Sequence, residues 1–527
     1  MEICDKYLRD YLKINVRLSS FFVDKYKYNQ SIQPNVYSDD HFKKILQVNK
    51  KYSKLLSEKK KKTPLSYFDN ILYRDLTYEK HFDENYKIYM YLPIDLYENI
   101  LVNYVGEYQK NNFTTKKHYE SFMSRIKMLT PITQDILYQF KRGMKQKVTL
   151  NKDVVERMIG IYKDHLQNRN CNKRTSSNIP VNYEKLVQLH IYDNLYLLTT
   201  FLEDVYSKHS SLSLGLSQYK GGKEYYKNII RFKTFDDYTP EKVHALGLRE
   251  LKVLLREKKR LQTSMKVKDI DDYVYNNVPL SNDVIKDMET YRDVTYEKIY
   301  KKYFYNKLLK KDLYKVIPFK GFGYAYYSLR NSGSHKRVGY VSMNVEESKK
   351  SSKDELLALS IHEGVPGHHL ERYTSWNNKS LPDYMKMSSE TMYIEGWAFY
   401  CEGLYDYKDD VKYYGKLQYD VLRTLRLIVD TGIHYYGWNY EKSYKYMKKY
   451  MKNMSEESLR DEILRYSCNP GQAVCYKLGG MIFEKLKNYS LQRGMTIQDF
   501  HEKVLSIGPA PMESFIREFM NQCGSKG

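Results

Sequence analysis

The sequence has little glycine and proline, and its cysteines are few and scattered. With 25 glycines and 13 prolines among 527 residues, the chain is poorly suited to be a β-sandwich or a disordered protein, both of which need many turn-forming residues. The six cysteines form no CxxC pair and no closely spaced framework. This pattern excludes a paired-cysteine zinc module and favours free thiols in a reducing compartment.

The chain also lacks apolar segments of the kind that enter or cross a membrane. The first 18 residues, MEICDKYLRDYLKINVRL, carry charges throughout and contain no apolar core of signal-peptide length. No stretch approaches the roughly 18 apolar residues that are needed to span a bilayer. We therefore expect a soluble, intracellular protein with no membrane partner.

Positive charge is in excess but is not concentrated in one place. The chain has 87 Lys and Arg residues against 64 Asp and Glu residues, which gives a formal net charge of +23. Such a charge would suit a nucleic-acid-binding protein. However, the longest basic run is only Lys59–Lys62, and basic residues are spread along the whole chain. We therefore expect a solvated basic surface and no specific nucleic-acid partner.

The most informative stretch covers residues 352–371 and reads SKDELLALSIHEGVPGHHLE. Ser352 and Glu355 form a capping box, which predicts a helix start, and an apolar run continues this helix to His362 and Glu363. A His-Glu pair that closes an apolar helix indicates a zinc hydrolase, in which neutral imidazoles hold Zn²⁺ and the glutamate takes a proton from water. We therefore predict His362 as a metal ligand and Glu363 as the general base.

The second histidine departs from the HExxH motif, in which two histidines lie four residues apart on one helix face. Four residues after His362 stands Pro366, which cannot bind a metal, and His368 and His369 follow. On an unbroken helix His368 would point away, and His369 would lie about 10 Å along the axis, so a metal site requires the Gly-Val-Pro-Gly segment to bulge. We interpret the run as HExGH with two inserted residues, which makes His368 the ligand and His369 its neighbour, although the residues leave this choice open. A structural corner with a histidine-capped helix is the alternative.

A third ligand is expected from residues 388–405, SSETMYIEGWAFYCEGLY, which read as a largely buried helix with serines at its N-cap. A buried glutamate without a partner is unfavourable, so Glu395 is either a metal ligand, which we favour, or the partner of an Arg or Lys. Glu402, seven residues later, falls on the same helix face and is expected behind the ligands.

Four blocks, HEGVPGHHLE, IEGWAFYCE, DTGIHYYGW and NPGQAVCYKLG, occur in this order in the second half of the chain. They resemble the signature blocks of a bacterial family that is similar to gluzincin zinc metallopeptidases and is catalogued as domain-of-unknown-function family 885. The resemblance covers roughly residues 119–519. It implies a mainly α fold, a large helical bundle with a deep active-site cleft and a small antiparallel β-hairpin beside the metal helix. It also implies a Zn²⁺-dependent peptidase with short peptides as substrates.

Within this fold we expect residues 1–118 to form an N-terminal helical region and residues 119–527 to form the metallopeptidase-like body. The metal site would lie within residues 352–405, and the whole chain would make one continuous compact fold. Residues 317–345 are the one β-like region. Because gluzincin-like enzymes bind extended substrate on a strand beside the metal helix, the resemblance places substrate on residues 338–345, with Tyr340 as a contact. A hairpin that only caps the helices is the alternative.

Further candidates lie on the helix expected over residues 417–436. Asp430 and His434 are four residues apart and share a helix face. Metal-bound histidines usually donate their second N–H to a carboxylate, and Asp430 is a candidate for that role. His434 is a candidate for binding the substrate carbonyl oxygen or the oxyanion. An internal Asp–His pair without a catalytic role is the alternative.

The last block begins with a turn and then enters a helix. The resemblance implies that Tyr476 directs its hydroxyl into the site and stabilises the oxyanion, and Gln472 is a candidate contact for the substrate backbone. The resulting prediction is a zinc metallopeptidase, with a non-catalytic metal-binding or binding scaffold as the alternative. A hydrolase that acts on another type of bond is a further possibility.

Overall fold

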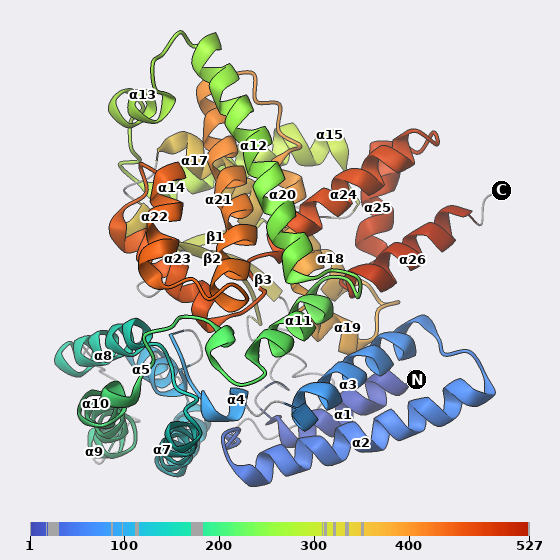
Figure 1. The fold of residues 1–527 in the computed structure, drawn as a ribbon. Helices are drawn as coiled ribbons and strands as arrows, with labels where there is room; N and C mark the ends of the chain where they lie inside the picture. Colours follow the sequence, from blue (N-terminus) through green and yellow to red (C-terminus); the bar gives the residue numbers. More distant parts are fainter. Residues whose placement is uncertain are drawn as a thin grey trace. The chain divides into compact units, whose positions relative to one another are not determined.

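The computed structural model of the chain has two compact units, each mainly α-helical (Figure 1). The first unit covers residues 1–214 and the second covers residues 215–527. Within them the structure describes residues 2–16, 18, 31–85, 88–96, 99–110, 115–169, 183–307, 309, 313–319, 323–331, 337–348 and 352–524. The mainly α fold class that the sequence predicts is confirmed.

The division between the units differs from the expected boundary between residues 118 and 119. Helices on both sides of that boundary pack together within the first unit. Arg125 forms an ion pair with Glu107, and the rings of Tyr108 and Tyr183 lie 6.0 Å apart. These contacts join the start of the expected second domain to the helices that precede it.

The first unit consists of helices around a core rich in aromatic rings. The buried ring of Phe122 lies 6.3 Å from that of Tyr104 and 6.5 Å from that of Tyr183. Buried tyrosines of this kind account for part of the 56 tyrosines in the chain. The elements are α1 (Ile3–Ile14), α2 (Asp39–Lys62), α3 (Tyr67–Asn85), α4 (Ile88–Tyr91), α5 (Ile100–Lys110), α6 (Lys116–Ile126), α7 (Leu129–Gln146), α8 (Lys152–Gln167), α9 (Tyr183–Val187), the π-helix η2 (Gln188–Tyr192), α10 (Asp193–Asp204) and the 3₁₀ helix η3 (Tyr206–His209).

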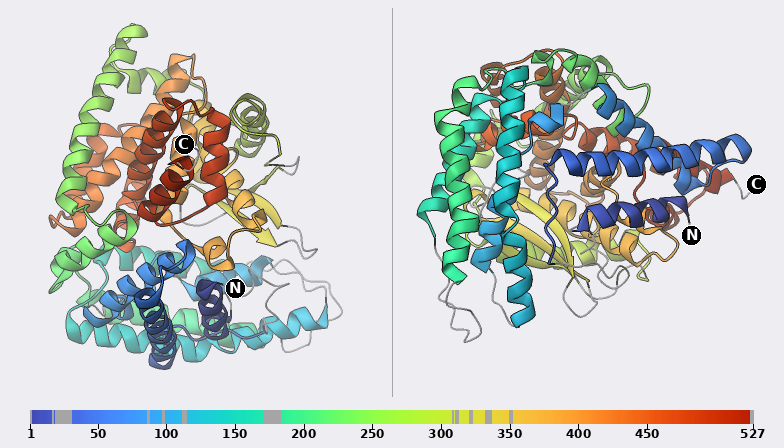
Figure 2. Two further views of the ribbon diagram at one scale, coloured as in Figure 1. Left: turned by 90° about the vertical axis from the view of Figure 1, so that its right-hand side faces the viewer. Right: turned by 90° about the horizontal axis from the view of Figure 1, so that it is seen from below.

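The second unit combines helices with a small sheet. Its long helices α12 and α21 run side by side (Figure 1), and α24, α25 and α26 lie next to one another (Figure 2). The elements are η4 (Leu216–Gln218), α11 (Gly222–Lys233), α12 (Pro240–Ser264), α13 (Ile270–Asn277), α14 (Val284–Thr295), η5 (Tyr296–Tyr300), α15 (Lys301–Tyr303), β1 (Lys315–Phe319), β2 (Ala325–Asn331), β3 (Arg337–Asn344), α16 (Val345–Ser348), α17 (Lys353–Glu363), α18 (His368–Asn377), α19 (Asp383–Met387), α20 (Thr391–Glu402), α21 (Asp410–His434), α22 (Tyr440–Tyr450), α23 (Glu456–Cys468), α24 (Cys475–Leu491), α25 (Ile497–Ile507) and α26 (Met512–Gly524).

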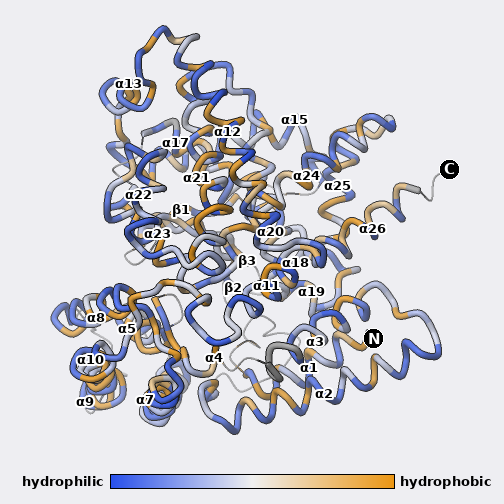
Figure 3. Tube along the Cα trace, in the orientation of Figure 1, coloured by the Kyte–Doolittle hydropathy of each residue, from blue (hydrophilic) through white to orange (hydrophobic). Residues whose placement is uncertain are grey.

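Helix α21 lies in the core of the second unit. Every side chain from Val421 to His434 is buried, and apolar residues, orange in Figure 3, are frequent along this helix. It contacts α12, α17, α23 and α24. By contrast, α22 is polar and buries only Ser443 and Met447. No helix in the described part of the chain is long and apolar enough to cross a membrane.

The sheet has three strands in the order β1-β3-β2. Strand β3 pairs parallel with β1 and antiparallel with β2, so that Val341 stands opposite both Val316 and Tyr327. The expected hairpin is therefore β2–β3, and the parallel neighbour β1 was not predicted. Because β3 has a partner on each side, its backbone cannot pair with an extended substrate. The prediction that residues 338–345 bind substrate in this way is wrong, and the ring of Tyr340 instead lies 4.8 Å from the Arg330 guanidinium.

Candidate metal centre

Helix α17 begins and ends where the sequence predicts. The Ser352 hydroxyl accepts a hydrogen bond from the Glu355 N–H, and the Glu355 carboxylate accepts one from the Ser352 N–H. The helix then runs through a wholly apolar or buried segment and ends at Glu363. It thereby places His362 and Glu363 in its last turn, inside the unit.

The Gly-Val-Pro-Gly segment after α17 forms the bulge that a metal site requires. The Gly367 N–H donates to the Ile361 carbonyl at 3.0 Å, and the chain turns so that α18 starts at His368. A Cβ atom at Gly367 would lie only 2.1 Å from the His362 carbonyl oxygen. Only glycine fits this close approach, which brings His368 back towards His362.

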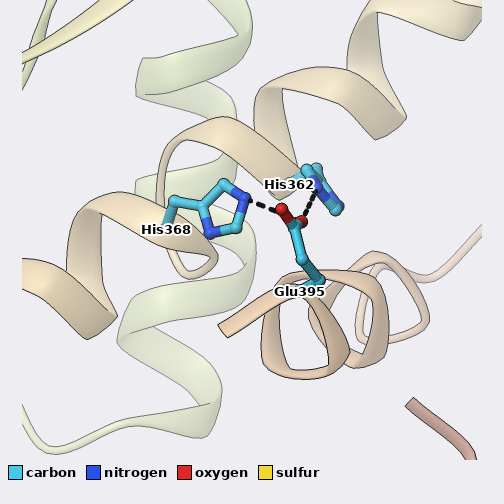
Figure 4. Close-up of side chains that lie close together, drawn as sticks. All are labelled: His362, His368 and Glu395. Atoms are coloured by element: carbon cyan, nitrogen blue, oxygen red, sulfur yellow. Dashed lines mark ion pairs between the residues drawn. The ribbon is translucent and has the colours of Figure 1, made fainter. Parts of the chain in front are cut away.

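Three predicted ligands meet in this place, with their side chains directed towards one another (Figure 4). Nε2 of His362 lies 3.4 Å from Oε2 of Glu395, and Nε2 of His368 lies 3.3 Å from the same oxygen. A tetrahedral Zn²⁺ site with ligands about 2.0–2.1 Å from the ion has edges of about 3.3–3.4 Å between ligand atoms. The two His–Glu separations therefore suit one shared ion, and all three ligand atoms lie within 4.8 Å of one another.

The chemistry of these three side chains also fits a divalent cation. Oε2 of Glu395 is a buried atom without a hydrogen-bond partner in the described structure. Burial opposes ionisation of Glu395, but the neighbouring His368 and His362 imidazoles hold the pKa of its carboxyl well below the usual range. An ionised, buried carboxylate oxygen facing two imidazole nitrogens forms a donor set that catalytic Zn²⁺ sites use.

Glu402 lies behind the ligands, on the helix face where the sequence places it. Its Oε1 accepts a hydrogen bond from Nδ1–H of His362 at 2.8 Å and one from Arg423 at 2.6 Å. Donation through Nδ1 leaves Nε2 of His362 for the metal. Arg423 was not predicted; it is buried, and its guanidinium lies 5.1 Å from the Phe399 ring. It supplies the opposite charge that the fully buried Glu402 requires.

Glu363 is buried, with 7% of its surface exposed. Among the described residues its carboxylate has no hydrogen-bond or ion-pair partner, and it follows His362 directly in the chain. The carboxylate is thus available to accept a proton from a water molecule at the site.

His369 faces away from the ligands. Its Nδ1 lies 3.0 Å from the Tyr327 hydroxyl on β2, and its ring sits so close to Gly339 on β3 that a Cβ there would lie 2.5 Å from Nδ1. The structure therefore answers the question that the residues left open: His368 faces Glu395, and His369 faces the sheet.

Asp430 does not reach a ligand histidine. Its carboxylate accepts hydrogen bonds from the Tyr226 hydroxyl and from the Gly471 N–H, the latter at 3.1 and 3.2 Å. Burial raises the pKa of Asp430 to about 7. The hydrogen bond to His362 that was predicted for Asp430 is made by Glu402, and Asp430 instead ties α21 to α11 and to the turn before α24.

His434 is fully buried and uses both ring nitrogens within the protein. Nδ1 accepts from the Leu216 N–H at 3.2 Å, and Nε2–H donates to the Tyr466 carbonyl at 2.8 Å. Burial lowers the pKa of His434 to about 4, in keeping with a neutral ring. The Tyr226 ring stacks on it at 5.1 Å. His434 therefore has no atom free for substrate, and the oxyanion role predicted for it is wrong.

Tyr476 lies beside His362, and the oxyanion role that the resemblance implies for it stays a prediction. Its ring is nearly parallel to the His362 imidazole, with centroids 6.0 Å apart. Its oxygen accepts hydrogen bonds from Arg465 at 2.9 Å and from Gln472 at 3.3 Å. With both lone pairs engaged, the hydroxyl proton remains for donation to a further oxygen. Gln472, expected to contact substrate, supports Tyr476 instead, because its amide oxygen accepts from Arg465 at 2.8 Å.

Glu395 and Tyr476 are carried by α20 and α24, whose backbones touch. A Cβ atom at Gly396 would lie 2.5 Å from the Gly479 Cα, and one at Gly479 would lie 2.2 Å from the Met392 carbonyl oxygen. Close helix packing through paired small residues sets the distance between the two side chains. The glycines of IEGW and KLGG are the sequence signal that could have predicted this contact.

Trp397 fixes α20 to the bulge. Its indole Nε1–H donates to the Pro366 carbonyl at 3.0 Å, and the ring is fully buried. This hydrogen bond ties the helix of Glu395 to the segment that precedes His368. Helix α20 itself starts at Thr391 without a side-chain cap, so the serine cap and the longer helix that the sequence predicts are not present.

Comparison with known proteins gives a family and a fold. A family model described as "Bacterial protein of unknown function (DUF885)" matches residues 27–518. Among solved structures, the chain is similar to a candidate lipoprotein of Colwellia psychrerythraea, with a TM-score of 0.82 and 18% identity over 99% of this chain and 98% of that one. It is also similar to a candidate lipoprotein of unknown function from Shewanella oneidensis, with a TM-score of 0.68 and 14% identity over 98% of each. The comparison with curated proteins found no match.

Proposed function

The chain belongs to the bacterial protein family DUF885, whose description names no function, and we propose from the chemistry of its site that it is a zinc-dependent hydrolase. The most specific form of this proposal is a metallopeptidase that cleaves short peptides. The observation that carries it is the buried Oε2 of Glu395, which has no hydrogen bond and faces His362 and His368. The unpartnered Glu363 carboxylate beside this group adds the base that hydrolysis needs.

Each residue of the site has a separate role in the proposed reaction. Zn²⁺, when held by the two imidazoles and Glu395, would supply the Lewis acidity that activates water and polarises a carbonyl group. Glu363 takes a proton from the attacking water, whose oxygen bonds to the carbonyl carbon. As the C–N bond breaks, Glu363 returns this proton to the leaving amine. The Tyr476 hydroxyl donates to the carbonyl oxygen as negative charge develops there.

Glu402 and Arg423 prepare the site without touching substrate. By accepting the Nδ1–H of His362, Glu402 fixes the ring in the tautomer that presents Nε2 to the ion. Arg423 holds Glu402 in place and balances its charge. A deep cleft that admits short peptides stays a prediction.

Metal content is the first test of this proposal. We expect about one Zn²⁺ per chain in the purified protein, as in other single catalytic zinc sites, measured by mass spectrometry of the metal. His362→Ala, His368→Ala and Glu395→Gln should lose it. His369→Ala is the matched control and should keep it. A wild-type protein that takes up no metal after incubation with Zn²⁺ would contradict a zinc site.

Hydrolysis is the second test. The metal-loaded protein is incubated with a peptide library, and new termini are identified by mass spectrometry. Glu363→Gln should keep the metal and lose the cleavage. A wild-type protein that binds zinc but cleaves no peptide favours the alternative, a metal-binding scaffold that keeps a peptidase-like fold, or a hydrolase of a different bond.

The cellular location needs its own measurement. The intracellular location expected from the sequence stays a prediction, and both solved relatives are described as candidate lipoproteins. Fractionation of the producing cells, followed by detection with an antibody against this protein, distinguishes an intracellular location from a membrane or exported one. Recovery in the membrane or exported fraction would contradict the expectation and would place its peptide substrates outside the cytoplasm.

A further inference from the structure

A groove that shares no residue with the metal centre lies in the second unit, between helices α12 and α24. Its volume is about 530 Å³, within the range of pockets that bind small molecules. Its floor is apolar and includes Leu246 from α12 and Leu478, Met481 and Ile482 from α24. These residues take no part in the metal centre.

The border of this groove is positively charged. Lys242, Arg249 and Lys485 line it, together with the single acid Glu241. Glu241 already accepts a hydrogen bond from the Tyr435 hydroxyl. Among the described residues, Arg249 and Lys485 have neither a hydrogen-bond nor an ion-pair partner. An apolar floor bordered by two unpaired cations is complementary to a molecule that is apolar at one end and anionic at the other.

The spacing of two lining residues suggests the size of this molecule. Lys242 and Arg249 both line the groove and stand seven residues apart on α12, about 10 Å along the helix axis, which is comparable to an aliphatic chain of about eight to ten carbons. The apolar floor disfavours strongly hydrated polyanions, because they would lose water without gaining partners. The unpaired cations disfavour a cationic amphiphile.

We propose that the groove between α12 and α24 binds a small anionic amphiphile, a medium-chain carboxylate whose tail lies on Leu246, Met481 and Ile482. Its carboxylate pairs with Arg249 or Lys485 at the border. Charge complementarity and the volume of the groove select this ligand class. The proposal is independent of the zinc site, since neither the metal nor any metal-centre residue takes part.

The first experiment is a calorimetric titration of the full chain with sodium decanoate below the concentration at which micelles form. We expect saturable binding of one decanoate per chain. Decyl maltoside, which has the same tail and no charge, should bind at least tenfold more weakly, and decyltrimethylammonium should not bind. Equal binding of the cationic and anionic amphiphiles would overturn the proposal.

Variants identify the groove as the site. Arg249→Gln combined with Lys485→Gln should weaken decanoate binding by at least about tenfold, and Ile482→Glu should abolish it, because a carboxylate then occupies the floor. Arg256→Gln, which removes an exposed cation of the same helix outside the groove, is the matched control and should bind as wild type. Circular dichroism melts confirm that each variant is folded.

Two results would reject the inference. The first is wild-type binding by both the double variant and Ile482→Glu. The second is a wild-type dimer in sedimentation velocity that Ile482→Glu converts to a monomer, because the groove would then be a contact between two copies of the chain. Since no substrate or metal is added, neither result bears on the proposed hydrolase activity.

Discussion

The sequence assigns two groups of histidine and carboxylate in the second unit to the same site. One consists of His362 with Glu402 and Glu395, the other of His434 with Asp430, and the two groups differ in their hydrogen bonds. In the metal centre, His362 uses Nδ1 to bind Glu402 and keeps Nε2 facing Oε2 of Glu395, which has no hydrogen bond. In α21, His434 uses both nitrogens and Asp430 uses both oxygens within the fold. What distinguishes these two groups is therefore the carboxylate oxygen of Glu395, which is left without a hydrogen bond between two imidazoles, rather than the residue types or their spacing.

The largest expected effect comes from comparing Glu363 with His434, which the sequence both assigned to catalysis. Glu363→Gln should lower kcat by about 10²–10⁴, the usual contribution of a general acid-base group. His434→Gln should leave kcat per folded molecule unchanged and lower the free energy of unfolding by about 1–3 kcal/mol, because it removes buried hydrogen bonds. Peptide hydrolysis rates and urea melts measure both. If His434→Gln lost activity while keeping its stability, the distinction between the two regions would fail.

The next comparison removes one phenol hydroxyl in each region. Tyr476→Phe should lower kcat by about 10²–10³, as the loss of an oxyanion donor does, with little change in KM. Tyr226→Phe removes the hydroxyl that binds Asp430 and should leave kcat unchanged. Steady-state kinetics on one cleaved peptide test the pair. Equal rates for wild type and Tyr476→Phe would remove Tyr476 from the mechanism.

A third comparison changes one carboxylate to an amide in each region. Glu402→Gln should weaken Zn²⁺ binding by about 10–100-fold, because outer-shell partners of metal ligands contribute at this level. Asp430→Asn should bind Zn²⁺ as tightly as wild type. Competition with a chromogenic chelator gives both dissociation constants. Weaker binding by Asp430→Asn would show that α21 supports the metal after all.

The last expected effect concerns pH and belongs to α21 alone. Burial raises the pKa of Asp430 to about 7 in the folded protein, above its value of about 4 in the unfolded chain. The folded state therefore holds the proton more tightly, and this contribution to stability is present at low pH and is lost as pH rises towards 7. The slope is at most about 1.4 kcal/mol per pH unit between these values.

The measurement compares unfolding of wild type and Asp430→Asn at several pH values between 5 and 8. The variant lacks the titrating group, so wild type should lose stability relative to it as pH rises. A difference between the two proteins that stays constant with pH would mean that Asp430 titrates near its ordinary value.

Local features of the candidate site could be read from the sequence, and long-range ones could not. The capping box, the end of α17 and the required bulge all depend on neighbouring residues, which is why His362 and His368 were placed together. Glu395 was instead predicted from its position on a separate, largely buried helix. The partner of His434, by contrast, is Leu216, 218 residues earlier in the chain. Nothing in the spacing of Asp430 and His434 reveals that contact.

Dependence on tertiary packing also explains why the Arg423–Glu402 pair and the strand β1 were not predicted. Arg423 lies on the helix that was predicted, but its pairing with Glu402 depends on how α20 and α21 pack. The pairing of β1 with β3 is parallel, and parallel neighbours leave no turn signal between them. Fold class is encoded by periodicity along the chain, whereas the choice among equally suitable histidines depends on tertiary packing.

The contact between Gly396 and Gly479 has a consequence for heating. Glu395 adjoins one glycine and Tyr476 lies one turn from the other, so the proposed metal ligand and the proposed proton donor depend on the same close contact between the two helices. Any fluctuation that separates α20 from α24 removes both in a single event. Heat inactivation should therefore release the metal and abolish turnover at one temperature, without an intermediate that still binds zinc but turns over slowly.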